Sequence, residues 1–308
     1  MEAHHEHHHH HAHHHVPGHF GRAFAIGIGL NLSFVLAEVA FGILGGSLAL
    51  LADAGHNFAD VFGLILAWTG GRLAQRSPTL RFTYGLRGAS ILSALANAIF
   101  LLLVTGGIVW ESVLRLLHPE PVLAWDIIIV AAVGVVINTA TALLFVAGQK
   151  TDLNLRAAFL HMAGDAALSL AVAGTGVLIL LTGWLWPDAA VSIIVSGFIV
   201  WFTWGVLRES MGLALHAVPM GIDPVAVRRF LLSQRGVEDV HDLHIWAMST
   251  TENALTAHLI MPGGTPGDDF LHHLAEDLDQ QFRIHHPTLQ VETGGGTHDC
   301  ALAPDAHV

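Results

Sequence analysis

Cysteine and charged residues are both scarce in this chain of 308 residues. The single cysteine, Cys300, excludes an internal disulfide framework. Charged residues make up only 12% of the chain and hydrophobic residues 53%. That balance is typical of a protein that crosses the bilayer several times and carries a modest soluble part. The formal net charge of −12 does not favour nucleic acid as a partner.

Histidine, by contrast, is abundant, with 24 copies. Many of them form a tract from His4 to His19, interrupted by Glu6 and Ala12. The tract cannot build a core, so we expect residues 1–19 to be disordered. It also lacks the apolar middle and the cleavage site of a signal peptide. A metal-loading arm, a purification tag and a solvated tail are all compatible with it. The interruptions favour a native arm that binds metal weakly.

Six apolar segments follow, each long enough to cross a bilayer. We expect spans at about Ala23–Leu44, Leu48–Gly70, Ala89–Trp110, Ile127–Ala147, Ala157–Leu181 and Ala189–Leu207. Together they predict a six-helix transmembrane domain over residues 20–212. Basic residues gather in the loops after the second and fourth spans. By the positive-inside rule these loops, and with them both termini, are cytoplasmic.

The second and fifth spans each carry a histidine and an aspartate four residues apart, His56 with Asp60 and His161 with Asp165. On a helix this spacing stacks the two side chains on one face. Two imidazoles and two carboxylates brought together form a four-ligand site of the kind that Zn²⁺ prefers. Ionisable groups inside a membrane are costly and mark a substrate or ion path. One pair alone could equally be a helix-stabilising hydrogen bond, whereas two matched pairs favour a metal site.

Glu38 lies midway along the first span and should face protein or a wet cavity, in a structural or a functional role.

Beyond Pro219 the composition becomes that of a soluble domain. There the pattern predicts a helix from about Pro224 to Gln234, strands at Val237–Met248 and Ala254–Met261, a helix at Asp268–Phe282 and a short strand at Leu289–Glu292. This order indicates a small α+β layer, a ferredoxin-like αββαβ domain over residues 213–296, followed by a flexible tail over 297–308.

These features together resemble the cation diffusion facilitator family of zinc transporters. The six spans, the His-x-x-x-Asp motif in the second and fifth, and the soluble α+β domain all agree with it. Three local stretches also resemble its bacterial zinc/cadmium/cobalt-resistance branch: Leu51–His56, Arg81–Arg87 and Val240–Trp246. The resemblance implies a homodimer in the inner (plasma) membrane that exports divalent metal, chiefly Zn²⁺, from the cytoplasm in exchange for protons. Cd²⁺, Co²⁺ and Ni²⁺ are further candidate ions, and the protein would not be an enzyme.

The resemblance also implies which residues act in transport. The transport site would consist of His56, Asp60, His161 and Asp165. Asp53, one turn before His56, resembles a polar position beside the site or on the proton path rather than a ligand. A histidine at position 56 resembles the zinc-preferring pattern, whereas members with aspartate there commonly accept cadmium.

Four residues of the soluble domain resemble the family's cytoplasmic metal ligands: His241, His258, His285 and Glu292. Zn²⁺ bound there would be structural or regulatory. His272 and His273 are rival ligands on the following helix, and Cys300 would add a ligand from the tail. The group could equally be a set of surface histidines, because the chain is rich in histidine throughout.

Two other classes of protein remain possible interpretations. One is a membrane-embedded zinc hydrolase, since histidine and aspartate ligands with an open position can activate water. The sequence lacks His-Glu-x-x-His, and no separate general base is evident near the two pairs. The other is a metal sensor or buffer whose arm and soluble domain act while the spans serve as an anchor. Matched ligands inside two of the six spans argue against it.

Overall fold

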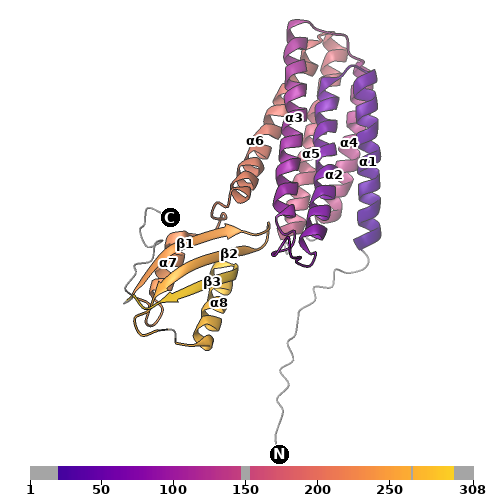
Figure 1. Ribbon diagram of the computed structural model, residues 1–308. Helices are drawn as coiled ribbons and strands as arrows, with labels where there is room; N and C mark the ends of the chain where they lie inside the picture. Colours follow the sequence, from indigo (N-terminus) through magenta and orange to yellow (C-terminus); the bar gives the residue numbers. More distant parts are fainter. Residues whose placement is uncertain (1–19, 147–152, 265, 295–308) are drawn as a thin grey trace, which may run out of the picture.

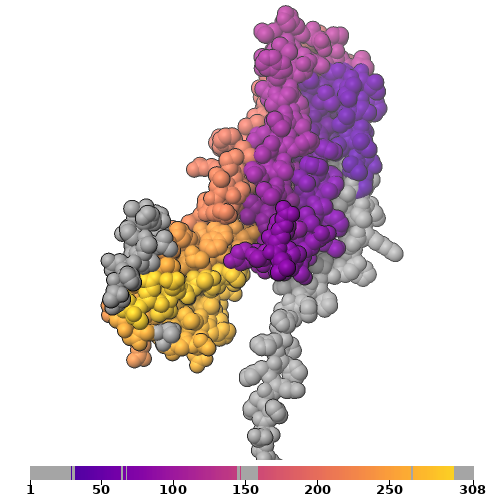
Figure 2. All heavy atoms as spheres, in the orientation of Figure 1, coloured from indigo at the N-terminus to yellow at the C-terminus, as the bar shows by residue number. Residues whose placement is uncertain are grey.

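The computed structural model describes residues 20–146, 153–264 and 266–294. The histidine-rich arm and the tail with Cys300 lie outside the described residues. The chain forms a tall bundle of long helices with a smaller α/β domain at its lower end (Figures 1 and 2). The bundle helices α1 to α6 are Phe20–Leu44, Leu48–Ala74, Ala89–Leu117, Ala124–Phe145, Leu153–Thr182 and Trp186–Ala214.

Five helices are long and apolar enough to cross a membrane within the described residues, and these are α2 to α6. In α1 the apolar stretch, Leu32–Leu44, is shorter than those of the five. The outer surface of the bundle carries large exposed apolar side chains such as Trp68, Leu103 and Trp201. In water these would be costly to expose, whereas lipid solvates them. The bundle is therefore the membrane part of the protein.

Helix α2 occupies the centre of the bundle and contacts α1, α3, α5 and α6, while α4 pairs with α5 and α3 with α6. Small side chains on α2, including Ala49, Ala52 and Ala59, are almost completely buried. Small residues let neighbouring helices approach closely inside a membrane. This central position places the polar residues of α2 against α5.

The start of α2 is fixed by a buried carboxylate from α6. Asp188 accepts hydrogen bonds from the Ser47 hydroxyl at 2.5 Å and from the Leu48 N–H at 2.7 Å. Ser47 in turn caps the helix by accepting from the Leu50 N–H at 3.1 Å. The unpaired N–H groups of a helix start are thus satisfied inside the membrane domain, where water cannot do so.

The C-terminal domain contains α7 (Pro224–Leu232), β1 (Asp239–Ala247), β2 (Asn253–Ile260), α8 (Asp268–Phe282) and β3 (Ile284–Glu292), in the predicted order. Strand β2 is central, antiparallel to β1 and parallel to β3. The core between sheet and helices is formed by apolar side chains that include Leu231, Leu255 and Leu274.

Strand β3 is longer than the sequence pattern predicted. It begins at Ile284, which is completely buried and pairs with Asn253, rather than at Leu289. The run His285-His286-Pro287 breaks the hydrophobic alternation by which strands are recognised. Pairing with β2 nevertheless continues through it, since β3 lies at the edge of the sheet, where proline is tolerated.

The two parts of the molecule touch where the loop between α2 and α3 meets the turn between β1 and β2 (Figure 1). Arg87 forms an ion pair with Glu252, and the Thr250 N–H donates to the Ser90 hydroxyl at 3.1 Å. The basic loop after the second helix and the C-terminal domain therefore lie on the same side of the bundle.

Candidate metal sites

The four residues of the two His-x-x-x-Asp pairs come together where α2 packs on α5. The Nε2 atom of His56 lies 3.8 Å from Asp60 Oδ2 and 3.3 Å from Asp165 Oδ1. The Nε2 atom of His161 lies 3.2 Å from Asp60 Oδ2 and 3.8 Å from Asp165 Oδ2. Each imidazole therefore lies between two carboxylates, one from its own helix and one from the other. We call these four side chains the membrane ring.

The separations in the membrane ring suit a tetrahedral ion. Zn²⁺ bonds of about 2.0–2.1 Å hold tetrahedral ligand atoms roughly 3.3 Å apart, which is near the four histidine–aspartate separations. Ligand atoms of His56, Asp60 and Asp165 all lie within 4.8 Å of one another, and His161 is outside that group, so a four-ligand site requires His161 to move inward. The side chain of Asp165 is only 4% exposed, whereas that of His161 is 45% exposed. The ring thus has a buried inner side and an open outer side. That geometry suits an ion that must both enter and leave.

Asp53, expected beside this site, is fully buried one turn before His56. It accepts a hydrogen bond from the Ser169 hydroxyl of α5 at 3.0 Å and is not part of the ring. Next to His56, Asn57 donates to Glu38 of α1 at 3.1 Å. Asn57 was not expected at the site from the sequence alone. It is the third polar residue within about one turn of α2, after Asp53 and His56, and this grouping could have indicated it.

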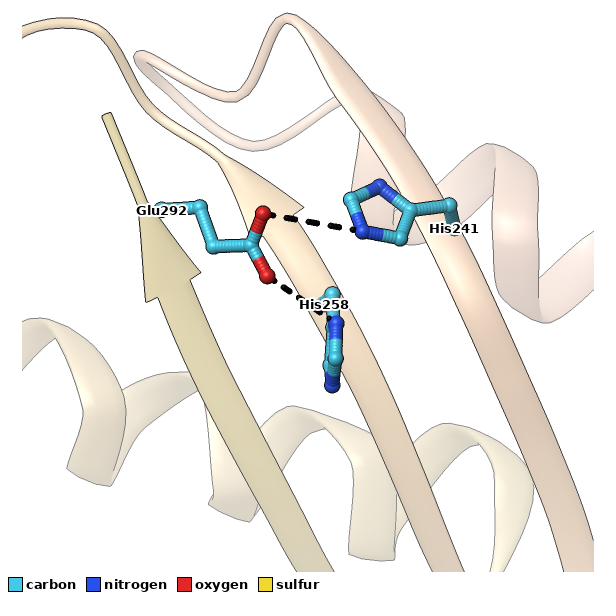
Figure 3. Close-up of side chains that lie close together, drawn as sticks. All are labelled: His241, His258 and Glu292. Carbon is cyan, nitrogen blue, oxygen red and sulfur yellow. Dashed lines mark ion pairs between the residues drawn. The ribbon is translucent and has the colours of Figure 1, made fainter. Parts of the chain in front are cut away.

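The C-terminal domain holds a second group of ligands on one face of its sheet, formed by His241, His258 and Glu292 (Figure 3). The two histidines are direct partners across β1 and β2, and Glu292 is the partner of Ile260 across β2 and β3. Residues two apart on a strand share a face, so Glu292 lies on the same side as His258. We call these three residues the sheet cluster.

Contacts within the sheet cluster are close. Glu292 Oε1 lies 3.0 Å from His258 Nδ1, and Glu292 Oε2 lies 3.7 Å from His241 Nε2. The two imidazole rings are 5.1 Å apart and nearly perpendicular. The Nε2 atom of His241 is buried and has no hydrogen-bond partner among the described residues. A nitrogen in this position is available to a metal ion.

His285, expected as a fourth ligand, is not brought to the sheet cluster. It lies at the start of β3, seven residues before Glu292, which is roughly 23 Å along an extended strand. Its Nδ1 atom accepts from the Asn253 N–H at 3.3 Å, and its Nε2 atom lies 3.6 Å from Asp279. The early start of β3 is the reason, because it moves His285 to the opposite end of the sheet.

The rival histidines also lie away from the sheet cluster. His272 and His273 are on α8, where both contact Glu276, and their side chains are 73% and 75% exposed. Asp242, which was not expected from the sequence, lies beside the sheet cluster. Its Oδ2 atom lies 3.5 Å from His258 Nε2. The reason is a β-bulge after His241, where Asp242 has a φ of 51° and departs from strict alternation.

A bundle of apolar helices around four side chains of the types that bind metal is what a membrane metal transporter would need. Comparison with known proteins gives the family. Residues 24–213 match the model of the cation efflux transmembrane domain, and residues 219–294 match that of the cation efflux protein cytoplasmic domain. This chain belongs to the cation efflux family, also called the cation diffusion facilitator family. Members of the family are transporters, not enzymes, so the hydrolase alternative is excluded.

Individual relatives are similar in sequence to this chain over most of its length. It is 33% identical over 277 residues to the metal cation efflux system protein CzcD of Cupriavidus metallidurans, covering 90% of this chain and 88% of that protein. It is 32% identical over 289 residues to the zinc transporter ZitB of Escherichia coli, covering 93% and 90%. It is 30% identical over 274 residues to the cadmium, cobalt and zinc/H(+)-K(+) antiporter of Bacillus subtilis, covering 87% and 88%. The protein is a multi-pass membrane protein with a cytoplasmic C-terminal domain.

Proposed function

We propose that this protein is a proton-coupled antiporter that exports divalent metal cations, chiefly Zn²⁺, from the cytoplasm. The observation that carries the proposal is the membrane ring of His56, Asp60, His161 and Asp165. Its four histidine–aspartate separations are 3.2–3.8 Å, close to the edge of a tetrahedral zinc site of roughly 3.3 Å. The names of the relatives, a zinc transporter and a cadmium, cobalt and zinc/H(+)-K(+) antiporter, support the same substrate class.

Proton coupling follows from the chemistry of these ligands. Metal binds neutral imidazole and ionised carboxylate, so protons and metal compete for the same atoms. Histidine changes its charge near physiological pH, which suits it to such an exchange. Asp60 and Asp165 give the metal-free ring two negative charges when its histidines are neutral, and one divalent ion cancels them. With no thiolate in the ring, zinc is held less tightly than in a structural cysteine site and can be released.

In the proposed arrangement the protein lies in the inner membrane and has six spans, α1 in addition to α2 to α6. Both termini lie in the cytoplasm. The contact of Arg87 with Glu252 supports this arrangement, because it places the basic loop on the side of the C-terminal domain. We assign residues 20–212 to the transmembrane domain and 213–296 to a ferredoxin-like domain. The His-rich arm of residues 1–19 would then face the metal pool that is exported.

The functional unit is a homodimer in this proposal, and the sheet cluster binds a structural or regulatory Zn²⁺. His241, His258 and Glu292 supply nitrogen and oxygen ligands of the types that zinc uses, and Asp242 lies within reach of His258. A metal that binds only the folded, closed form stabilises that form by mass action. Cd²⁺, Co²⁺ and Ni²⁺ are further candidates for transport.

Transport into proteoliposomes that carry a pH gradient tests the proposal. Wild-type protein should accumulate Zn²⁺ when the lumen is made acidic, and the pH of the lumen should rise in step with zinc uptake because protons leave in exchange. The variant with both Asp60→Asn and Asp165→Asn should do neither. Zinc uptake that is equal in the double variant would rule out the membrane ring. Zinc binding without net flux in the wild type would favour the sensor or buffer interpretation.

A further inference from the structure

Two carboxylates outside the membrane ring, Glu38 of α1 and Asp53 of α2, lie together in the interior of the membrane domain. Both side chains are completely buried. They lie within hydrogen-bonding reach of each other. Across the described residues, neither forms an ion pair with a lysine, arginine or histidine. Two carboxylates this close to each other and removed from water cannot both remain ionised without compensation.

The two carboxylates have fewer hydrogen-bond donors than oxygens to accept them. The two groups have four carboxylate oxygens, and the side-chain donors that reach them are Asn57, bonded to Glu38 Oε2, and Ser169, bonded to Asp53 Oδ2. Glu38 Oε1 and Asp53 Oδ1 are buried and have no hydrogen-bond partner among the described residues. A protonated carboxyl group donates, whereas an ionised one only accepts. A protonated carboxyl group in the pair therefore supplies a donor that two ionised groups lack.

From this geometry we propose that Glu38 and Asp53 form a proton-binding site that is separate from the metal ligands and holds one of the protons exchanged for zinc. This inference rests on the proposed antiport. The pair is connected to the membrane ring on both sides. Asn57 follows His56 directly on α2, and Ser169 lies one turn after Asp165 on α5.

Charge balance gives the pair its role. The charged groups that face it are Asp165 of α5 and His56 of α2. With the ring free of metal, the negative charge of Asp165 holds a proton on the pair. Zn²⁺ bound in the ring replaces that negative field with positive charge, which compensates a second ionised carboxylate, so the pair releases its proton. When zinc departs, the proton returns.

Counting the protons released on zinc binding tests the proposal. Zinc is titrated into the detergent-solubilised full-length protein in weakly buffered solution with a pH indicator. Subtracting the same titration of the Asp60→Asn, Asp165→Asn variant removes the protons released from the arm and from the sheet cluster. Glu38→Gln should keep the fold, because its amide can donate to Asp53 in place of the shared proton. It should release about one proton fewer per zinc ion than the wild type, since the pair titrates as a single unit.

Two controls and one independent measurement complete the test. Asp126→Asn, on α4 and outside both groups, should release as many protons as the wild type. Asp53→Asn repeats the experiment from the other partner, in case Glu38→Gln fails to fold. In the wild type itself, infrared difference spectra should show the carbonyl stretch of a protonated carboxylic acid disappearing when zinc binds.

Failure of the proposed antiport and failure of the carboxylate pair give different results. If the wild type releases no more protons than the subtracted ring variant, the proposed transport site fails and this inference fails with it. If the ring binds zinc normally but Glu38→Gln releases the wild-type number of protons, only the assignment of the pair is overturned. An unchanged infrared spectrum in the wild type would overturn it as well.

Discussion

The membrane ring takes its four proposed ligands from two helices, whereas the sheet cluster takes its three proposed ligands from three strands. The ring contains two carboxylates and the sheet cluster one, Glu292. A divalent ion therefore leaves the ring neutral and the three-residue cluster with one surplus positive charge, which Asp242 beside His258 can offset. A neutral complex is the one that can be held where water is scarce, because an unpaired charge there is costly. We therefore expect the ring to hold a neutral complex while an ion crosses the membrane, and the cluster to depend on Asp242 for its remaining charge.

The two groups also differ in their surroundings. The ring has an open side at His161 and lies against further buried polar groups, whereas the cluster is backed by the apolar core of its own small domain. Metal in the ring can thus respond to protons and to helix movement. Metal in the cluster can stabilise a domain or hold two domains together. If the contrast is correct, substitutions in the two groups should have different effects.

The largest effect is expected when a carboxylate is removed from the ring. Asp60→Asn or Asp165→Asn takes away one of two negative charges, so a divalent ion is no longer neutralised. Since loss of an outer-shell partner alone can cost 10–100-fold in metal affinity, we expect zinc flux to fall by on the order of 100-fold or more. Flux into proteoliposomes measures this.

Asp126→Asn serves as the matched control, because it removes a carboxylate of the same domain away from the ring. It should transport at nearly the wild-type rate. All variants should elute as folded protein of wild-type size. Near-normal flux in both ring variants would refute the assignment of the transport site.

Removal of the cluster histidines should act on stability instead of flux. Zinc at about 100 times its dissociation constant would stabilise the C-terminal domain by about 2.7 kcal/mol. For a domain of this size that corresponds to a rise in Tm of roughly 10–20 °C. A fragment from residue 219 to 308 should show this rise, and the double variant His241→Ala, His258→Ala should lose it while keeping its fold.

His285→Ala is the informative control for that experiment. It removes a histidine from the same strand as Glu292 but at the other end, so the zinc-dependent rise should persist. If it abolished the response, His285 would have to reach the metal, for example from a second subunit. If the wild-type fragment did not respond to zinc at all, the cluster would be a set of surface histidines.

A smaller effect is expected on selectivity when one ligand type is exchanged within the ring. His56→Asp replaces a nitrogen ligand by a carboxylate that accepts a wider range of geometries. Hardness alone would argue against cadmium, so the prediction rests on the relaxed tetrahedral constraint. The ratio of cadmium to zinc flux should rise severalfold, measured with both metals in competition. An unchanged ratio would place selectivity elsewhere in the protein.

The location of the ring could be predicted from sequence, because it depends on local spacing within two helices. His56 with Asp60 and His161 with Asp165 are each one turn apart, and the only long-range requirement is that α2 and α5 are neighbours. The pairing of Glu38 with Asn57 and Asp53 could not be derived in this way. It depends on how α1 is rotated against α2, and the apolar pattern of a lipid-facing helix leaves that rotation undetermined.

The sheet cluster was predicted less well for a related reason. His241, His258 and Glu292 meet only through the register of three strands, and a bulge at Asp242 and the early start of β3 both alter that register. Helix ends were also underestimated. Helix α3 continues from the predicted end at Trp110 to Leu117. Composition marks where apolar residues stop, and a helix can extend beyond that point into polar surroundings.

The smallest effect should come from the contact that joins the two regions. Arg87 and Glu252 form an ion pair in which the side chains are 36% and 38% exposed. Exposed pairs contribute about 0.2–1 kcal/mol, so Arg87→Gln or Glu252→Gln should lower zinc flux by no more than about fivefold. Because both variants break the same contact, the double variant should lose no more than either alone. Exchanging the charges, with Arg87→Glu and Glu252→Arg together, should restore much of the flux, most clearly at low salt, where such a pair is least screened. Additive losses, or no rescue by the exchange, would mean that the two residues act independently and that the regions communicate through α6 instead.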